Sequence, residues 1–298
     1  MTIVVPEKYH AKKALQDARV QCIDQELALK EDIRALKIGI LNIMPQADRY
    51  EYSLLHPLGR SILQIEPIWI RLQKHQYSST SHQHLEELYL YFEDVISQRC
   101  LDGLILTGAP VEDIDFSKVL YWNEIKEILQ YARKNIHSVM GICWGGLALA
   151  KILEIEKVVY PKKIFGVFQT TNLNKNHPIM GDHDDVFWCP HSRHAGIRDD
   201  VLESEAKNGS INLLAYSNEA GYTIFESNDN RFLMHLGHPE YNAHRLVDEY
   251  NRDVNLGRKD VDPPVNISLE NPQNRWRGHR NEFFGQWIKY IHDKNQSK

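Results

Sequence analysis

The sequence predicts an α/β protein with a mostly parallel central sheet that helices cover on both faces. Two observations support this fold class. Apolar runs of strand length alternate with segments of helical periodicity through the first half of the chain. Those runs are apolar at nearly every position, which is typical of strands buried on both faces of a parallel sheet. We therefore expect three layers, with the sheet between two layers of helices.

The first half of the chain supplies these elements in order. The first 35 residues carry helical periodicity, so we expect an N-terminal extension that packs on the core. Strands are expected at residues 37–43, 65–72 and 103–106, and directly before Cys143. Helices are expected between them, around residues 54–58, from the polar segment 78–81 to Ile96, and over residues 121–132.

In the second half of the chain, the length and spacing of the strand-like segments change. From Val167 onward the strand-like segments are short, and we expect them to pair antiparallel or to extend the same sheet. The strand 231–236 is expected to return to the core beside the strand that precedes Cys143. A last helix, at about 280–293, carries an apolar face and is expected to pack on the body of the protein. Because no repeat or linker interrupts the sequence, we expect one domain over residues 1–298.

Composition argues against several classes of function. The formal net charge is −5 and no run of basic residues occurs, which argues against binding to nucleic acid. No apolar stretch reaches the length of a membrane span, and the N-terminus lacks the apolar core of a signal peptide. We therefore expect a cytoplasmic protein with no membrane partner. The four cysteines lie far apart, without the spacing of a disulfide framework or a zinc site.

One cysteine is distinguished by its surroundings. Residues 139–148 have the pattern of an apolar strand, a sharp turn at Cys143, and a helix that starts with Gly145 and Gly146. This is the pattern of a nucleophile elbow with sulfur in place of oxygen. A helix N-terminus below a thiol stabilises the thiolate, which is the nucleophilic form. A cysteine after an apolar run is more often a small buried residue, so the pattern needs a catalytic partner.

That partner follows another predicted strand. Residues 231–236 lead into His238, and Glu240 comes two residues later. A cysteine, a histidine base and a carboxylate that orients the base are the parts of covalent acyl transfer. A His-Pro pair alone is commoner as a turn. Both sites, however, follow strands of one predicted sheet, where open α/β sheets place their ligand crevices.

Most of the chain resembles a known family of enzymes. From Val5 to about Tyr290 it is similar to the homoserine O-acyltransferases that are built on the class I glutamine amidotransferase fold, a flavodoxin-like three-layer fold. The motifs that carry the resemblance are residues 41–45, 107–112, 142–145, 163–168, 187–194, 237–241 and 274–277. Enzymes of this family move an acyl group from coenzyme A to the side-chain hydroxyl of homoserine, on a route to methionine. The resemblance implies a coenzyme A thioester as co-substrate, and no bound cofactor or metal.

The resemblance also implies a mechanism. The Cys143 thiolate attacks the thioester carbonyl and keeps the acyl group, and coenzyme A leaves. His238, oriented by Glu240, then deprotonates the acceptor hydroxyl. Backbone N–H groups of Trp144 and Val111 are expected to form an oxyanion hole, in which one donor is typically worth about 3 to 4 kcal/mol.

Further residues are assigned to the substrates by the same resemblance. By analogy, Lys163, Ser192 and Arg252 line the amino-acid pocket, where a guanidinium can bind both oxygens of a carboxylate. Glu112 occupies the place that helps to choose the acyl donor, where glycine goes with succinyl-CoA and glutamate with acetyl-CoA. Two like charges about 4 Å apart repel by roughly 1 to 4 kcal/mol, so Glu112 would disfavour a succinyl group. We expect acetyl-CoA as the donor.

The acceptor has two candidates because the chain departs from the family pattern close to the motifs. The departures are Gln46, Ala47, Gly141, Leu147, Gly278 and Arg280. Lost polar groups around a small pocket can change its size. We expect L-homoserine as the acceptor and keep L-serine as the alternative. The expected partners are thus small molecules, and a homodimer is left open.

Three rival hypotheses compete with this one. A glutaminase would use the same triad on the same fold, but Leu147 stands where many amidotransferases carry glutamine. A non-enzymatic binding protein does not need a complete triad. A metal site from the acidic segment 182–185 with His191 and His194 is weaker, because fifteen histidines make chance spacings common.

Overall fold

The computed structural model describes residues 2–31, 33–98 and 100–296. The strands are β1 (Thr2–Val4), β2 (Gln21–Ile23), β3 (Leu36–Leu41), β4 (Ile65–Arg71), β5 (Leu90–Tyr91), β6 (Gly103–Leu106), β7 (Ser138–Ile142), β8 (Val158–Asn172), β9 (Val186–Gly196), β10 (Ile211–Ser217), β11 (Gly221–Ser227) and β12 (Phe232–His235). The helices are α1 (Lys12–Asp17), α2 (Gln25–Lys30), α3 (Ala47–Leu58), α4 (His82–Leu88), α5 (Phe92–Gln98), α6 (Trp122–Asn135), α7 (Trp144–Ile152), α8 (Asp199–Lys207), α9 (Ala243–Asn255) and α10 (Arg277–Gln296). A short 3₁₀ helix covers Phe116–Lys118.

These strands form one sheet with a parallel and an antiparallel part. Its order is β2-β1-β4-β3-β6-β7-β12-β11-β10-β8-β9, and β5 pairs with β4. All neighbours from β2 to β12 are parallel, and those from β12 to β9 are antiparallel. The predicted α/β class is confirmed, and the short strands of the second half extend the same sheet.

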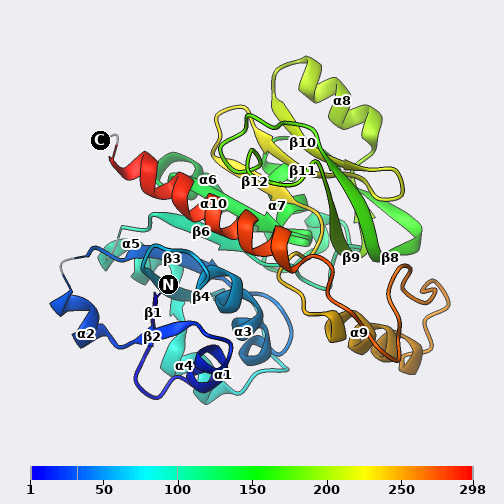
Figure 1. Ribbon diagram of the computed structural model, residues 1–298. Helices are drawn as coiled ribbons and strands as arrows, with labels where there is room; N and C mark the ends of the chain where they lie inside the picture. The colour runs from blue at the N-terminus through cyan, green and yellow to red at the C-terminus, as the bar shows by residue number, and fades with distance from the viewer. Residues whose placement is uncertain (1, 32, 99, 297–298) are drawn as a thin grey trace.

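Helices cover both faces of the parallel part. Along β6, Ile105 belongs to one core cluster, whereas Leu104 and Leu106 belong to the other. The first cluster contains apolar residues of α1, α3 and α10, and the second contains those of α5, α6 and α7. Figure 1 shows α10 crossing the sheet on the face where α3 lies. The strands are buried on both faces, as their apolar runs predict.

The N-terminal segment differs from the expectation of a helical extension. It contains α1 and α2, but β1 and β2 also add two parallel strands to the sheet, with Ile3 opposite Ile65 and Cys22. The reason is the apolar run Ile3 to Val5, which is buried like the other strands. Residues 2–23 therefore contribute two strands at one edge of the sheet, in addition to packing on the core.

The helix expected from residues 78–81 to Ile96 is interrupted at Tyr89. Here the backbone is extended, with φ −102° and ψ 134°, and the chain passes through β5 before α5 begins. The Tyr89 hydroxyl is buried, where it accepts from Asn42 at 2.8 Å and donates to Glu51 at 2.8 Å. A buried tyrosine hydroxyl needs such partners, and this tertiary requirement overrides the local helical pattern.

Among the described residues, no helix is long and apolar enough to span a bilayer.

Candidate active site

Cys143 lies in a tight turn between β7 and α7, as the sequence predicts. Its backbone has φ 52° and ψ −113°, a conformation that residues other than glycine rarely adopt. Two glycines allow the helix to approach the sheet this closely. A Cβ atom on Gly141 would lie 2.4 Å from the Gly145 carbonyl oxygen, and one on Gly145 would lie 2.2 Å from the Leu106 oxygen. The sequence thus specifies the elbow through positions that admit no side chain.

The neighbouring strand brings the histidine to the cysteine. β12 pairs in parallel with β7, and His235 lies opposite Ile142, so both chains leave the sheet at the same edge. A Cβ atom on Gly108 would lie 3.4 Å from His238 Cε1 and 3.5 Å from Cys143 Cβ, which places both side chains beside the same small residue. Both residues also line one cavity.

Two hydrogen bonds fix the carboxylate of Glu240. Glu240 Oε1 is 2.7 Å from His238 Nδ1 and accepts a second hydrogen bond from the Tyr50 hydroxyl at 2.8 Å. The ring of Tyr241 stacks on the imidazole at 4.0 Å between centroids. Contacts on its edge and its face therefore hold the imidazole in one orientation.

The charges around His238 favour its protonated form. Burial alone would lower its pKa, but the neighbouring Cys143 and Glu240, through charge and hydrogen bonding, raise the pKa well above its ordinary value. An imidazolium beside the cysteine stabilises a thiolate at Sγ. The geometry is that of a cysteine nucleophile with a proton donor and acceptor beside it.

The cavity also contains the three residues assigned to the amino-acid pocket. Lys163 is buried and its Nζ is 2.7 Å from Asp253 Oδ2. Ser192 donates a hydrogen bond to Glu249. Arg252 is half-exposed at the rim and contacts the other oxygen of Asp253 at 2.7 Å. Lys163 and Arg252 therefore pair with the same carboxylate, that of Asp253.

Glu112 lines the same cavity as Cys143 and is 9% exposed. Burial raises the pKa of its carboxyl group, whereas its own backbone N–H and the charge of Lys163 oppose that shift. Glu112 is therefore not a loop carboxylate in open water. A negative charge at Glu112 would lie in the same cavity as an acyl group carried by Cys143.

The sequence interpretation missed a group of residues on α9. Arg245 and Glu249 line the cavity together with Arg252, and Arg245 Nε is 3.4 Å from Glu249 Oε1. Tyr241 donates to the same oxygen at 2.8 Å. The pKa of Glu249 is lowered to about 2, because Lys163, Arg245, His238 and the Ser192 hydroxyl outweigh its burial. The spacing 245, 249, 252 places three charges on one helix face and is the signal that could have found them.

The two N–H groups of the predicted oxyanion hole differ in their hydrogen bonding. Cys143 is the residue before α7, so the N–H of Trp144 is among the first of the helix, which have no partner within it. The N–H of Val111 donates to the carbonyl of Ala109 at 2.8 Å. A substrate oxygen would have to replace that carbonyl before Val111 could contribute.

The departures from the family pattern lie outside this cavity. None of the six residues, Gln46, Ala47, Gly141, Leu147, Gly278 and Arg280, is among the described residues that line it. Gly141 is needed by the elbow and Leu147 is buried in the core. Proximity in sequence suggests a rebuilt acceptor pocket, but none of these positions lines the cavity, although Gly141 shapes the turn that holds Cys143.

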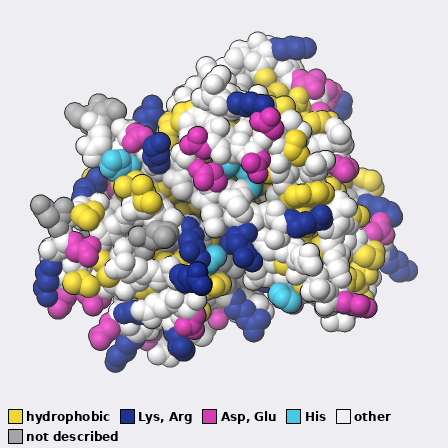
Figure 2. All heavy atoms as spheres, in the orientation of Figure 1, with side chains coloured by type: hydrophobic (Ala, Val, Ile, Leu, Met, Phe, Trp, Pro, Cys, Tyr) yellow, Lys and Arg dark blue, Asp and Glu magenta, His cyan; other side chains and the backbone are white. Residues whose placement is uncertain are grey.

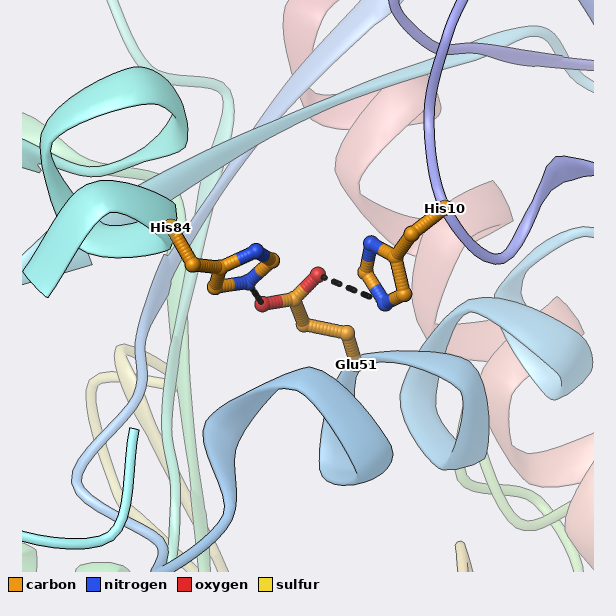
Figure 3. Close-up of side chains that lie close together, drawn as sticks. All are labelled: His10, Glu51 and His84. Carbon is orange, nitrogen blue, oxygen red and sulfur yellow. Dashed lines mark hydrogen bonds and ion pairs between the residues drawn. The ribbon is translucent and has the colours of Figure 1, made fainter. Parts of the chain in front are cut away.

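One group of side chains within the described ranges has the composition of a metal site, namely His10, Glu51 and His84 (Figure 3). Both oxygens of Glu51 already accept hydrogen bonds, from His84 at 2.7 Å and from the hydroxyls of Tyr9 and Tyr89 at 2.7 and 2.8 Å. The hydrogen bond to Glu51 raises the pKa of His84 and favours its protonated form, which binds no metal. The group ties the N-terminal segment to α3 and α4.

The acidic segment 182–185 does not belong to that group. His194 instead lies 3.4 Å from Asp260, and the His191 ring is 3.3 Å from Arg193 Nε. The expectation that the protein binds no metal stays a prediction.

A cysteine, a histidine and a carboxylate at the carboxyl edge of a parallel sheet define an enzyme with the class I glutamine amidotransferase-like fold. Solved structures with this fold include a glutamine amidotransferase from Thermotoga maritima, with a TM-score of 0.56 at 12% identity over 87% of this chain and 99% of that chain. Another is a glutamine amidotransferase from Methylobacillus flagellatus, with a TM-score of 0.55 at 15% identity over 87% of this chain and 96% of that chain. These likenesses show the fold alone.

The chain belongs to the homoserine O-succinyltransferase family, whose model matches residues 2–297. The homoserine O-acetyltransferase of Lachnoclostridium phytofermentans is 38% identical over 296 residues, 97% of each chain. That of Bacillus subtilis is 36% identical over 97% of this chain and 96% of its own. The protein is an acyltransferase with small-molecule substrates. The family description and the names of these relatives differ in the acyl group.

Proposed function

We propose that the protein transfers the acetyl group of acetyl-CoA to the side-chain hydroxyl of L-homoserine through an acyl-Cys143 intermediate. One observation carries this proposal. Cys143 and His238 open into the same cavity as Glu112 and the charged residues of α9, so nucleophile, donor selector and acceptor site share one space. We further propose that the reaction serves methionine synthesis in the cytoplasm.

In the first half-reaction, Cys143 Sγ forms a bond to the thioester carbonyl carbon. The bond from that carbon to the sulfur of coenzyme A breaks, and the leaving thiolate takes a proton from the His238 imidazolium. The raised pKa of His238 supports this role, because the ring holds a proton at neutral pH before acylation.

In the second half-reaction, the neutral His238 accepts the proton of the acceptor hydroxyl. The oxygen attacks the acyl-cysteine, the carbon–sulfur bond breaks, and the thiolate and imidazolium are restored. Glu240 stays ionised and stabilises the imidazolium through its hydrogen bond to Nδ1. Each turnover thus returns the site to its starting charges.

The choice of acetyl-CoA is supported by Glu112. A carboxylate that lines the cavity beside Cys143 would repel the terminal carboxylate of a succinyl group. The names of the relatives agree with an acetyl donor. The description of the family names a succinyl group, so the two donors are compared directly in the assay.

The choice of homoserine over serine is supported by the position of the departures. Because no described cavity-lining residue is among them, they give no reason for a shorter acceptor. The two amino acids differ by one methylene, which is worth about 1 to 3 kcal/mol in a fitted pocket. Arg252 suits the α-carboxylate of either one.

The test combines kinetics with detection of the intermediate. Purified protein is assayed with acetyl-CoA or succinyl-CoA against L-homoserine, L-serine and L-glutamine. We expect the highest kcat/KM for acetyl-CoA with homoserine. Mass spectrometry after brief exposure to acetyl-CoA without acceptor should find an acetyl group on Cys143.

Matched variants control for reactive thiols in general. Cys143→Ala should lose activity and acetylation, whereas Cys100→Ser, which removes an exposed thiol, should change neither. Equal kcat/KM for serine and homoserine would contradict the proposed acceptor. Glutamine hydrolysis without acyl transfer would favour a glutaminase.

A further inference from the structure

A second cavity of about 520 Å³ borders the catalytic carboxylate. It is formed by α3, the start of α10 and the segment after α1, and its wall includes Glu240. His238 lines the first cavity and Glu240 lines the second, so the hydrogen bond between them connects two separate spaces. The volume is within the range of small-molecule sites.

The walls of this cavity carry excess positive charge. Four arginines line it, namely Arg19, Arg60, Arg277 and Arg280, against the carboxylates of Asp17 and Glu240. Within the described ranges, none of the four arginines forms an ion pair. Figure 2 shows Lys and Arg side chains gathered at the centre of this face, where α10 begins in Figure 1.

The arginines repel one another in this arrangement. Arg280 is 4% exposed, and its pKa is lowered to about 10 by burial and by the charges of Arg277 and Arg60. The pKa of His56, whose Nδ1 is 3.2 Å from Arg280 Nη2, is lowered to about 4 by burial and by Arg280, Arg60 and Arg277. A bound anion would relieve this repulsion, and His56 adds no further charge at neutral pH.

Two buried polar atoms on this wall lack partners in the described structure. Arg60 Nε donates to no acceptor. Glu240 uses Oε1 for both of its hydrogen bonds, and its buried Oε2 accepts none. A ligand that suits the wall therefore has several acceptor oxygens for the arginines. A phosphate group carries three strong acceptor oxygens and nearly two negative charges at neutral pH, whereas a carboxylate carries two oxygens and one charge.

We propose that the cavity formed by Arg19, Arg60, Arg277 and Arg280 beside Glu240 binds the phosphate group of a small phosphorylated molecule. Arginine matches phosphate because its planar fork of N–H donors fits two phosphate oxygens. The bound phosphate lies in the cavity whose wall includes Glu240, the residue that orients His238, so occupancy of the cavity changes the charge beside the catalytic triad. This coupling rests on the proposed function, whereas the binding itself does not.

The binding is tested with inorganic phosphate, by calorimetric titration of the full chain without substrates. The wild type should bind phosphate saturably, and Arg60→Gln/Arg280→Gln should weaken binding about tenfold or more, because two charge-assisted contacts are lost. Arg198→Gln, which removes an exposed arginine paired with Asp200, should leave it unchanged. Arg277→Gln replaces an exposed side chain, keeps the core intact, and should weaken binding severalfold.

Absence of saturable binding, or equal affinity in wild type, the double variant and Arg277→Gln, would overturn the proposal. Because this readout needs no turnover, it is independent of the proposed reaction.

A second arm identifies the source of the phosphate. If the cavity holds the phosphates of coenzyme A, coenzyme A will displace inorganic phosphate, and Arg277→Gln will raise KM for acetyl-CoA but not for S-acetylpantetheine, which lacks the nucleotide. If the ligand is a separate molecule, phosphate will still bind at saturating coenzyme A and will change kcat. Either result supports a phosphate site.

Discussion

At the scale of single residues, Cys143 combines a nucleophilic side chain with an unfavourable backbone conformation. A side chain at φ 52° and ψ −113° costs about 1 to 3 kcal/mol, and the surrounding structure must hold it there. The backbone of Gly145 packs closely against the Leu106 carbonyl of β6, and this contact restrains the turn. The same turn presents Sγ to the cavity, so strain and reactivity arise from one feature.

This strain can be measured by removing the thiol in two ways. Cys143→Gly and Cys143→Ala both delete Sγ, but only alanine keeps the Cβ atom that the conformation disfavours. We expect Cys143→Gly to be more stable than Cys143→Ala by about 1 kcal/mol in chemical denaturation, with both inactive. An alanine variant of equal or greater stability would show that the turn is unstrained.

Glu112 gives a prediction about the acyl donor. Glu112→Gly removes charge and bulk, and Glu112→Gln removes mainly the charge, so both should raise kcat/KM for succinyl-CoA relative to acetyl-CoA by about tenfold. Asp113→Asn, at a neighbouring carboxylate of the same cavity, should change the ratio less. If Glu112→Gln leaves the ratio unchanged and Glu112→Gly raises it, size and not charge selects the donor.

At the scale of elements, the sequence predicts best where burial alone decides the structure. β3, β6 and β7 are apolar at nearly every position, because helices cover both of their faces. The proposed catalytic residues Cys143 and His238 could be found from the sequence for the same reason, because each follows a strand of this kind.

Elements whose structure depends on tertiary contacts were not predicted. β8 contains a polar segment from Pro161 to Lys163, and its pairing with β9 shifts register between Val159 and Ile164, so the sequence pattern does not indicate one continuous strand. Arg245 and Glu249 of α9 were missed because charged residues on a helix usually face solvent. Only the folded chain shows that this face closes the cavity.

Helix α3 carries Tyr50, which we expect to position the carboxylate of Glu240 for catalysis. Tyr50 donates to Glu240 Oε1 at 2.8 Å, so Tyr50→Phe removes one of the two hydrogen bonds that orient the carboxylate. We expect kcat to fall about tenfold with little change in KM, and stability to fall by about 1 kcal/mol.

The matched control is Tyr9→Phe, which deletes another buried hydroxyl, the one that donates to Glu51 at 2.7 Å. It should lower stability by a similar amount and leave kcat unchanged. Equal losses of kcat in both variants would assign Tyr50 a purely structural role.

At the scale of the whole molecule, buried histidines connect distant parts of the chain. His183, His235 and His279 come from the segment after β8, from β12 and from α10, and the His279 ring stacks on Phe187 at 3.7 Å. Burial lowers the pKa of His183 to about 4 and that of His235 to about 3, and it holds the pKa of His279 well below its ordinary value. These imidazoles are neutral in the folded state at physiological pH.

This arrangement predicts acid sensitivity. In the unfolded chain each histidine gains a proton near pH 6.5, whereas the folded chain resists protonation down to about pH 4 at His183. The unfolded state therefore binds more protons, and stability falls as pH decreases below about 6.5, by up to about 1.4 kcal/mol per pH unit for each histidine.

Replacement of one ring tests the origin of this effect. Both nitrogens of His279 are buried without a partner in the described structure, so His279→Phe should keep the stacking and lose less stability between pH 7 and pH 5 than the wild type. Denaturation midpoints at the two pH values provide the measurement. The same decline in both proteins would place the acid sensitivity elsewhere.

The position of α10 has a consequence for how the protein is made. Its residues 277–296 cover the apolar faces of α3 and the parallel strands, and Trp287 donates to Ser138 at 3.0 Å. On the ribosome, those faces are synthesised long before the helix that closes them. The newly made chain therefore exposes apolar surface until the segment 277–296 has been synthesised. Aggregation competes with folding throughout that interval.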